Sequence, residues 1–136
     1  MIDPALELQV AIVGALKAHT ALAAIVATRV YDAVPPSADY PYVSLGQPQV
    51  LPDKADCIDG SITVYTIHGW SSDLGRSVEI KRIGAAIGEA LDENEFTLNG
   101  HRVVIAQHEQ TNYLDDPDGI TKHVAVTLRF STEPTD

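Results

Sequence analysis

Histidine is the residue type in this chain with the most chemistry to offer. His101, His108 and His123 fall on strand-like segments that we expect to lie near one another, and His68 ends a further such segment. Imidazole nitrogens are common zinc ligands, so three of these side chains could converge on a metal ion. None of the four shows helical i, i+4 spacing, and no carboxylate stands at a motif-defining distance. We therefore expect surface or hydrogen-bonded histidines, with no metal and no cofactor.

Carboxylates gather in two places, within residues 92–95 and within residues 115–118. Oxygen ligands on loops suit calcium or magnesium, but neither cluster has the spacing of an EF-hand loop. Solvated turns, in which aspartate side chains accept hydrogen bonds from nearby backbone N–H groups, are the favoured interpretation.

Motifs for nucleophilic catalysis and nucleotide binding are absent from the sequence. There is no Gly-x-Ser-x-Gly, and the single cysteine, Cys57, stands among acidic residues that disfavour a thiolate. The glycines form neither a Gly-x-Gly-x-x-Gly pattern nor a phosphate-binding loop. We expect a protein that is not an enzyme. A small metal-dependent enzyme that uses the histidines or acids is the alternative from another class.

Two main helices are predicted to cover one face of a sheet. The first begins at Pro4, after Asp3 as N-cap, and runs to about Ala18. Its apolar side chains predict one broad buried stripe: Leu6, Leu8, Val10, Ile12, Val13 and Leu16. A short helix over residues 21–27 follows. The second main helix covers residues 74–91, where close packing would explain the glycines at positions 84 and 88.

About five strands, mostly antiparallel, complete an α+β fold in a single domain of residues 1–136. Strand patterns cover residues 29–32, 40–50, 61–70, 101–112 and 124–130. Asn99-Gly100 is the strongest hairpin signal, because both residues accept positive φ. In the last segment apolar and polar residues alternate strictly, so one face is buried. Large side chains at Val64 and Tyr65 leave two possibilities open for the third strand, namely cover on both faces or a bulge.

The polar face of the sheet or its edges are expected to be free for assembly, and two segments are expected to be exposed. Residues 49–59 have neither a helical nor a strand period and predict a long loop, with a merely tolerated insertion as an equal alternative. Residues 115–119 predict a turn. Candidate assembly contacts lie in two regions, residues 50–58 and residues 113–120: Val50, Leu51, Asp53, Lys54, Ile58, Tyr113, Leu114, Asp116, Asp118 and Ile120.

The charge balance limits the possible partners. The formal net charge is −10, from 19 acids against nine lysines and arginines, and such a surface repels phosphate. Direct DNA binding is therefore disfavoured. No apolar run approaches the ~18 residues of a membrane span, so we expect a soluble protein that has no membrane partner.

The segment Arg29-Val30-Tyr31-Asp32, followed by prolines and then by Tyr40-Pro41-Tyr42-Val43, resembles a family of small bacteriophage tail components. The resemblance continues in matching order through the helix at 74–91, the hairpin at 98–101 and the turn at 116–119. Members of this family occur in tailed phages, prophages and gene transfer agents, and are similar to tail terminators.

This resemblance implies a structural protein of the virion tail. Such a protein would cap the head-proximal end of the tail tube as a hexameric ring, end tube growth and join the tail to the head. The implied partners are further copies of itself, the tail tube protein and the head–tail connector protein. DNA would pass through the ring without specific binding. A head-side connector is the alternative within assembly proteins.

Overall fold

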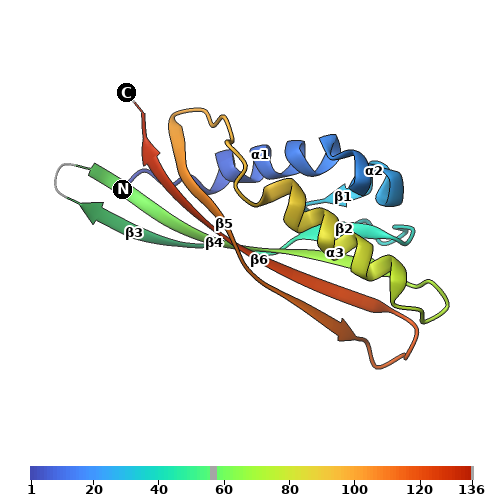
Figure 1. The fold of residues 1–136 in the computed structure, drawn as a ribbon. Helices are drawn as coiled ribbons and strands as arrows, with labels where there is room; N and C mark the ends of the chain where they lie inside the picture. The colour runs from blue at the N-terminus through green and yellow to red at the C-terminus, as the bar shows by residue number, and fades with distance from the viewer. Residues whose placement is uncertain (56–57, 136) are drawn as a thin grey trace.

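Helices form one layer and a twisted sheet forms the other in the computed structural model, which describes residues 1–55 and 58–135 (Figure 1). In chain order the elements are α1 (Ala5–Ala18), α2 (Thr20–Val26), β1 (Val30–Tyr31), β2 (Tyr42–Leu45), β3 (Gln49–Ala55), β4 (Ile58–Ser71), α3 (Val78–Leu91), β5 (His101–Asp115) and β6 (Lys122–Pro134). The α+β class with helices on one sheet face is confirmed. The sheet has six strands, one more than the sequence suggested.

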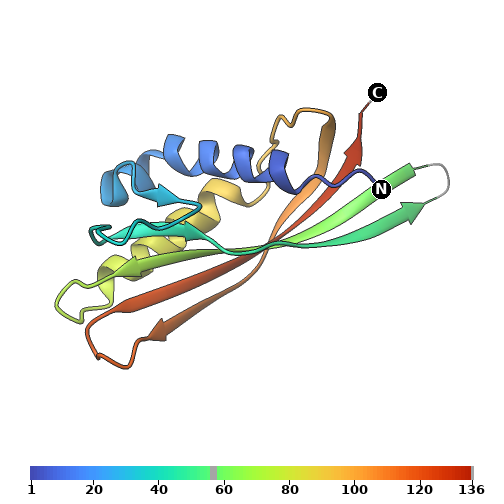
Figure 2. The same ribbon diagram turned by 180° about the vertical axis from the view of Figure 1, so that it is seen from behind.

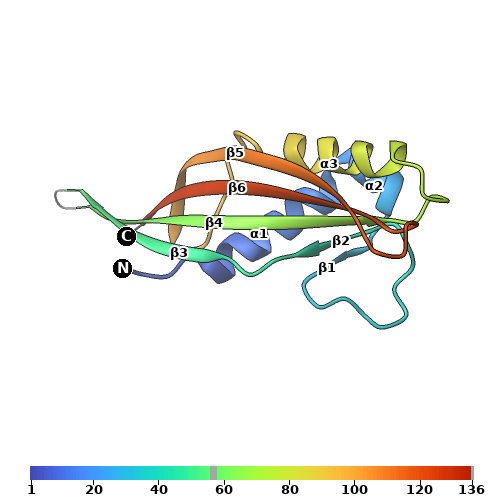
Figure 3. The ribbon, with the colours of Figure 1, turned by 90° about the horizontal axis from the view of Figure 1, so that it is seen from below.

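β4 is the long strand on which the sheet is built, since it pairs with β2, β3 and β6. The strand order is β1-β2-β4-β6-β5, and β3 pairs with the free half of β4. β2 lies antiparallel to the C-terminal half of β4, whereas β3 lies antiparallel to its N-terminal half (Figure 3). Only the short β1–β2 pairing is parallel among the described strands. One long strand therefore joins a helix-covered half of the sheet to a half that projects beyond the helices.

The loop predicted for residues 49–59 is wrong for the residues that the structure describes there. β3 and the start of β4 form an antiparallel hairpin that extends away from the helices (Figure 2). The sequence showed no period because β3 is an edge strand, where both faces tolerate polar residues. Pro52 is accepted for the same reason, since an edge strand has backbone N–H groups with no partner to lose. Cys57 lies outside the described residues.

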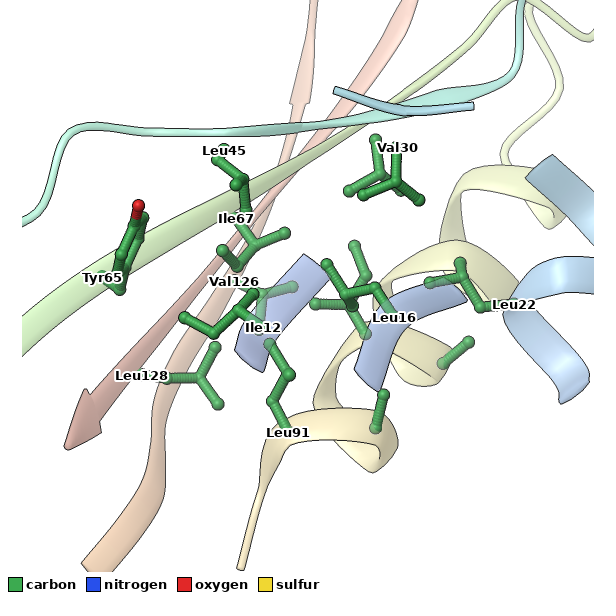
Figure 4. Packing of buried hydrophobic residues seen from close by; sticks show 14 of the residues in the cluster. Ile12, Leu16, Leu22, Val30, Leu45, Tyr65, Ile67, Leu91, Val126 and Leu128 are labelled. Carbon is green, nitrogen blue, oxygen red and sulfur yellow. The ribbon is translucent and has the colours of Figure 1, made fainter. Parts of the chain in front are cut away.

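The core fills the space between α1, α3 and the helix-facing side of β4 and β6 (Figure 4). The alternation predicted for the last strand is confirmed, because its apolar set is fully buried: Val124, Val126, Leu128 and Phe130. Helix α3 lies close to the sheet at Gly69, where an added Cβ would come within 2.6 Å of Ile83 Cγ2. Gly84 allows a similar approach by Tyr113, while an added Cβ at Gly88 would meet nothing within 4 Å.

The broad buried stripe predicted for the first helix is only partly correct. Leu8, Ile12 and Leu16 are fully buried, but Leu6 and Val10 are each 66% exposed. Two residues correspond to roughly 200° of rotation in an α-helix, so Leu6 and Val10 lie on the side opposite the core. The second apolar row of α1 therefore faces outward.

The structure resolves the ambiguity of the third predicted strand. Buried and half-exposed residues alternate along β4 from Thr63 to Ser71, and its pairing with β6 has no register shift. Tyr65 points into the core and Val64 points away from the helices. The irregularities lie instead in β5, between Val103 and Ile105 and further along the strand.

Several predicted boundaries shift, and the strand predicted over residues 40–50 is wrong beyond Leu45, where β2 ends before β3 begins at Gln49. Helix α3 begins at Val78, because residues 72–77 form turns. The reversal at Gly100 is present with a φ of 79°, but the segment before it makes a single bridge, from Thr97 to Arg102. Pro4 occupies the N-cap position of α1, and Asp3 Oδ1 accepts a hydrogen bond from Ala5 N at 2.8 Å.

Among the described residues, no single helix has the length and apolar character to cross a membrane. Helices α1 and α2 together meet that test of length and composition, but they are bent by 82° at the break between them.

Candidate functional site

One face of the sheet is covered by no helix of the described residues, and we call it the open face. In Figure 1 the three helices lie on one side of the sheet, and the open face is the other side. Its side chains come from alternate positions of the two central strands: Ile62, Val64, Thr66, His68 and Trp70 of β4, and His123, Ala125, Thr127, Arg129 and Ser131 of β6. All of them are half-buried or exposed. Apolar side chains stand among polar ones on this face, and an uncovered sheet face with apolar patches is a candidate binding surface.

Neighbouring rings, some stacked and some tilted, form the aromatic patch at one end of the open face: Tyr31, Tyr40, Tyr42, His68, Trp70 and His123. The indole of Trp70 is at its centre. It stacks on the His123 ring with centroids 3.9 Å apart and planes 4° from parallel, and its Nε1 donates to Ser44 Oγ at 3.1 Å. Flat, amphipathic rings held in this way offer a large contact area at small entropic cost.

A direct hydrogen bond between two histidines borders the Trp70 ring. His68 Nδ1 and His123 Nε2 lie 2.7 Å apart, so one ring donates and the other accepts. Burial lowers the pKa of His68. Burial also lowers the pKa of His123, the neighbouring His68 lowers it further, and Asp116 partly offsets the change. Both imidazoles therefore favour the neutral form, in which the N–H of one ring donates to the unprotonated nitrogen of the other.

The two other histidines that were considered as metal ligands, His101 and His108, do not join this pair. His108 Nε2 bonds Thr111 Oγ1 at 2.7 Å, and His101 is buried. The expectation of hydrogen-bonded histidines holds for His68, His108 and His123. Across residues 1–55 and 58–135, no three histidine, aspartate, glutamate or cysteine side chains are grouped to hold a metal ion.

The other end of the open face carries the aliphatic patch: Leu51, Ile62, Val64 and Ile105. Leu51 pairs with Ile62, whose partner on β6 is Ser131, and Ser131 in turn pairs with Ile105. Arg129 lies opposite Val64 and so borders this patch. Leu51 and Ile105 are both about half exposed.

The structure places the predicted assembly contacts at opposite ends of the sheet (Figure 1). The first group lies on the hairpin of β3 and β4: Val50, Leu51, Asp53, Lys54 and Ile58. The second group lies at the end of β5 and in the following turn: Tyr113, Leu114, Asp116, Asp118 and Ile120. Leu51 belongs to the aliphatic patch, and Leu114 pairs with His123 beside the aromatic patch.

Two members of the second group have internal roles. Tyr113 faces α3, where its hydroxyl lies 3.5 Å from the backbone oxygen of Lys81. Asp118 accepts hydrogen bonds from the backbone N–H groups of Ile120 and Thr121 and from the Thr121 hydroxyl, at 2.6 to 2.9 Å. These bonds lower the pKa of Asp118. The carboxylate thus orders its own turn, in line with the solvated-turn interpretation.

Sequence reasoning missed the aromatic patch. A strict period of two from Thr63 to Ser71 would have placed Trp70 and His68 on the side away from Tyr65 and Ile67. The competing possibility of a bulge prevented that inference. The stacking with Tyr42 and His123 depends on strand registers, which the sequence does not contain.

An open sheet face with aromatic and aliphatic patches is typical of a protein that binds other proteins. The class is therefore an α+β protein with one sheet face left uncovered by its helices. The family model "Tail completion protein gp17" matches residues 10–133, and the chain belongs to this family.

Individual relatives agree with this assignment. The chain is 26% identical over 92 residues to the "Tail completion protein gp17" of Bacillus phage SPP1, covering 68% of this chain and 67% of that protein. A chain in the structure "Virion of native gene transfer agent (GTA) particle" is 27% identical with a TM-score of 0.89, over 98% of this chain and 99% of that chain. The "Structure of bacteriophage SPP1 gp17 protein" has a TM-score of 0.61 at 23% identity, over 97% and 91% of the two chains, which shows a shared fold.

These matches confirm the resemblance to tail components of phages and gene transfer agents. The chain is a structural protein of a phage-like tail, and its location is the virion tail.

Proposed function

We propose that this protein, acting as a single domain, caps the head-proximal end of the tail tube as a ring, ends tube growth and joins the tail to the head. The observation that carries the proposal is the open face, which presents an aromatic and an aliphatic patch at its two ends. A component that meets copies of itself and also other virion proteins needs more than one binding surface, and this face offers two.

The proposed partners are further copies of the chain in a ring of six, the tail tube protein and the head–tail connector protein. Aromatic side chains in well-packed patches dominate binding energies, so Trp70 is the first candidate for a contact with another virion protein. Leu114, beside His123, extends the same surface. The net charge of −10 would let DNA pass through the ring without specific binding.

Particles assembled without the gene test this proposal by negative-stain electron microscopy. Tubes of uncontrolled length that lack heads are the expected result. Normal-length tails beside filled heads would move the protein to the head side of the joint, as a head completion protein. Intact particles would contradict both roles.

Complementation by variants then tests the aromatic patch. Trp70→Ala should fail to restore intact particles, because it removes the ring on which His123 stacks. Thr127→Ala, a smaller change on the same face, should restore them. Full complementation by Trp70→Ala would remove the aromatic patch from the proposed contacts.

A further inference from the structure

An apolar row on the outer side of α1 is left mostly exposed by the described part of the chain. Leu6 and Val10 lie about one helical turn apart and are each 66% exposed, and Ile2, just before the helix, is 61% exposed. Scattered exposed apolar side chains are normal in proteins, but a row along one helix side marks an interaction surface. Glu7 stands beside this row and lines the same groove as Leu6 and Val10, together with Leu98 of the loop before β5. The outer row is thus apolar with an acid at its edge.

The aliphatic patch on the open face has the complementary character. Arg129 lies between Val64 of β4 and Gln107 of β5, so the aliphatic patch borders it on one side. Its side chain is exposed and makes no hydrogen bond or ion pair with any residue in the described part of the chain. Arg102, another cation on that face, is already paired with Glu133. Arg129 is therefore an unpaired cation at the edge of the aliphatic patch, and an incoming acid could pair with it.

These two surfaces cannot meet within one chain. Helix α1 lies on the helix side of the sheet (Figures 1 and 2), whereas Arg129, which is opposite Val64, lies on the open face. A helix whose apolar row covers a sheet face is an ordinary layer of an α/β structure. This chain carries the outer row of α1 and the aliphatic patch on opposite sides of the molecule. A second copy can therefore bring its outer row onto the aliphatic patch of the first.

The dimensions limit the size of such a contact. The 14 residues of β4, with the neighbouring strands, give an open face of roughly 46 by 19 Å, or about 900 Å². The 14 residues of α1 span about 21 Å, half the length of the face, so the aromatic patch stays free. The contact then takes roughly 400 Å² from each copy, about half of what an interface of standard size takes, so it belongs to the small, weak class.

We propose that the outer row of α1 in one copy packs on the aliphatic patch of the next copy, with Glu7 facing Arg129. The proposal rests on the ring of the proposed function and names the surfaces that build it. Because the two surfaces differ, the contact is head-to-tail. Repetition of a head-to-tail contact closes into a ring when the rotation per copy allows it.

Sedimentation velocity on the purified full chain tests the contact, with native mass spectrometry to count copies. Leu6→Glu and Arg129→Glu should each weaken self-association at least about tenfold. The matched controls are Leu74→Glu, at an exposed loop position, and Arg82→Glu, on the exposed side of α3; both should associate as the wild type does. Thermal melts of each variant verify folding, which these exposed positions should not disturb.

Two combinations make the test specific for a head-to-tail contact. Glu7→Arg should weaken association alone and recover most of it together with Arg129→Glu, because the pair is reversed. A mixture of the Leu6→Glu and Arg129→Glu chains should give 1:1 dimers and no larger species, because each chain keeps one intact surface.

Several outcomes would overturn the proposal. Wild-type association in both single variants, a mixture without dimers, or a wild-type chain that is monomeric at its highest soluble concentration would each contradict it. Leu6→Glu chains that form rings but fail to complement particles would assign the outer row to another virion protein. In that case the proposed tail function stands, because it fails only if particles assembled without the gene are intact.

Discussion

At the scale of single residues, the burial of His68 and His123 makes the stability of this protein sensitive to pH. Both side chains have a pKa lowered from the usual 6.5, chiefly by burial. As pH falls below 6.5 the unfolded chain therefore binds protons before the folded chain does, and the folded state loses stability. Above that pH the two histidines are neutral in both the folded and the unfolded chain, so their protonation no longer lowers the free energy of unfolding.

We expect the free energy of unfolding to fall between about pH 7 and pH 5. A chain with both His68→Gln and His123→Gln should show a shallower dependence in urea titrations at each pH. His108→Gln, at an exposed histidine, is the control and should keep the wild-type slope. An unchanged slope in the double variant would contradict this interpretation. The lowered pKa of Asp118 acts only at more acidic pH, near and below 3.8.

Thr63 carries a buried hydroxyl without a hydrogen-bond partner among the described residues. An unpaired buried polar group costs about 1–3 kcal/mol, and valine has almost the same shape without that group. Thr63→Val should therefore raise the free energy of unfolding by about 1 kcal/mol in urea denaturation. Thr132→Val is the contrasting variant, since it removes the partner of the buried Ser61 hydroxyl, 2.8 Å away, and should destabilise. Equal effects of the two variants would refute the distinction.

At the scale of elements, the packing of α3 on the sheet distinguishes two glycines. Gly88 is inside α3 with open space around it, so Gly88→Ala should stabilise by about 0.5–1 kcal/mol through helix propensity. Gly69 faces α3 from β4, where a Cβ would lie 2.7 Å from Val124 Cγ1 and closer to Ile83. Gly69→Ala should therefore destabilise by about 1–3 kcal/mol.

Thermal and urea unfolding of the Gly88→Ala and Gly69→Ala variants test this difference in packing. The two changes in the free energy of unfolding should have opposite signs. Destabilisation by Gly88→Ala would mean that α3 has a neighbour at Gly88 in the folded chain, which is the close packing that the sequence suggested.

At the scale of the whole molecule, net charge opposes assembly. Each copy carries a formal charge of −10, and the proposed contact offers one new ion pair, Glu7 with Arg129. Salt shortens the Debye length from about 10 Å at 0.1 M to about 3 Å at 1 M, which screens repulsion between whole copies and also weakens the exposed pair. An exposed pair contributes at most about 1 kcal/mol, so relief of the repulsion should dominate.

Self-association should accordingly strengthen when sodium chloride is raised from about 0.05 M to about 0.5 M, as followed by sedimentation velocity. Sodium sulfate is unsuitable here, because it also strengthens apolar burial. Association that weakens with sodium chloride would mean that specific ion pairs outweigh the net charge in holding copies together.

The sequence by itself determined the elements whose patterns are local. Strict alternation placed the last strand with one buried face, and Asn99-Gly100 marked a reversal because glycine accepts positive φ. The order of these signals along the chain also indicated the correct family. The acid balance, which bears on partners, is likewise a property of composition alone.

Tertiary structure decided everything that depends on neighbours. β3 has no period of its own and is a strand only because β4 supplies its hydrogen-bond partners. The apolar pattern of the first helix showed which residues are hydrophobic, but only packing decided that Leu8 is buried while Leu6 faces solvent. The His68–His123 bond joins residues 55 positions apart, through a register set by the whole β4–β6 pairing. Binding surfaces belong to this second kind, because they form where segments distant in the sequence are brought side by side.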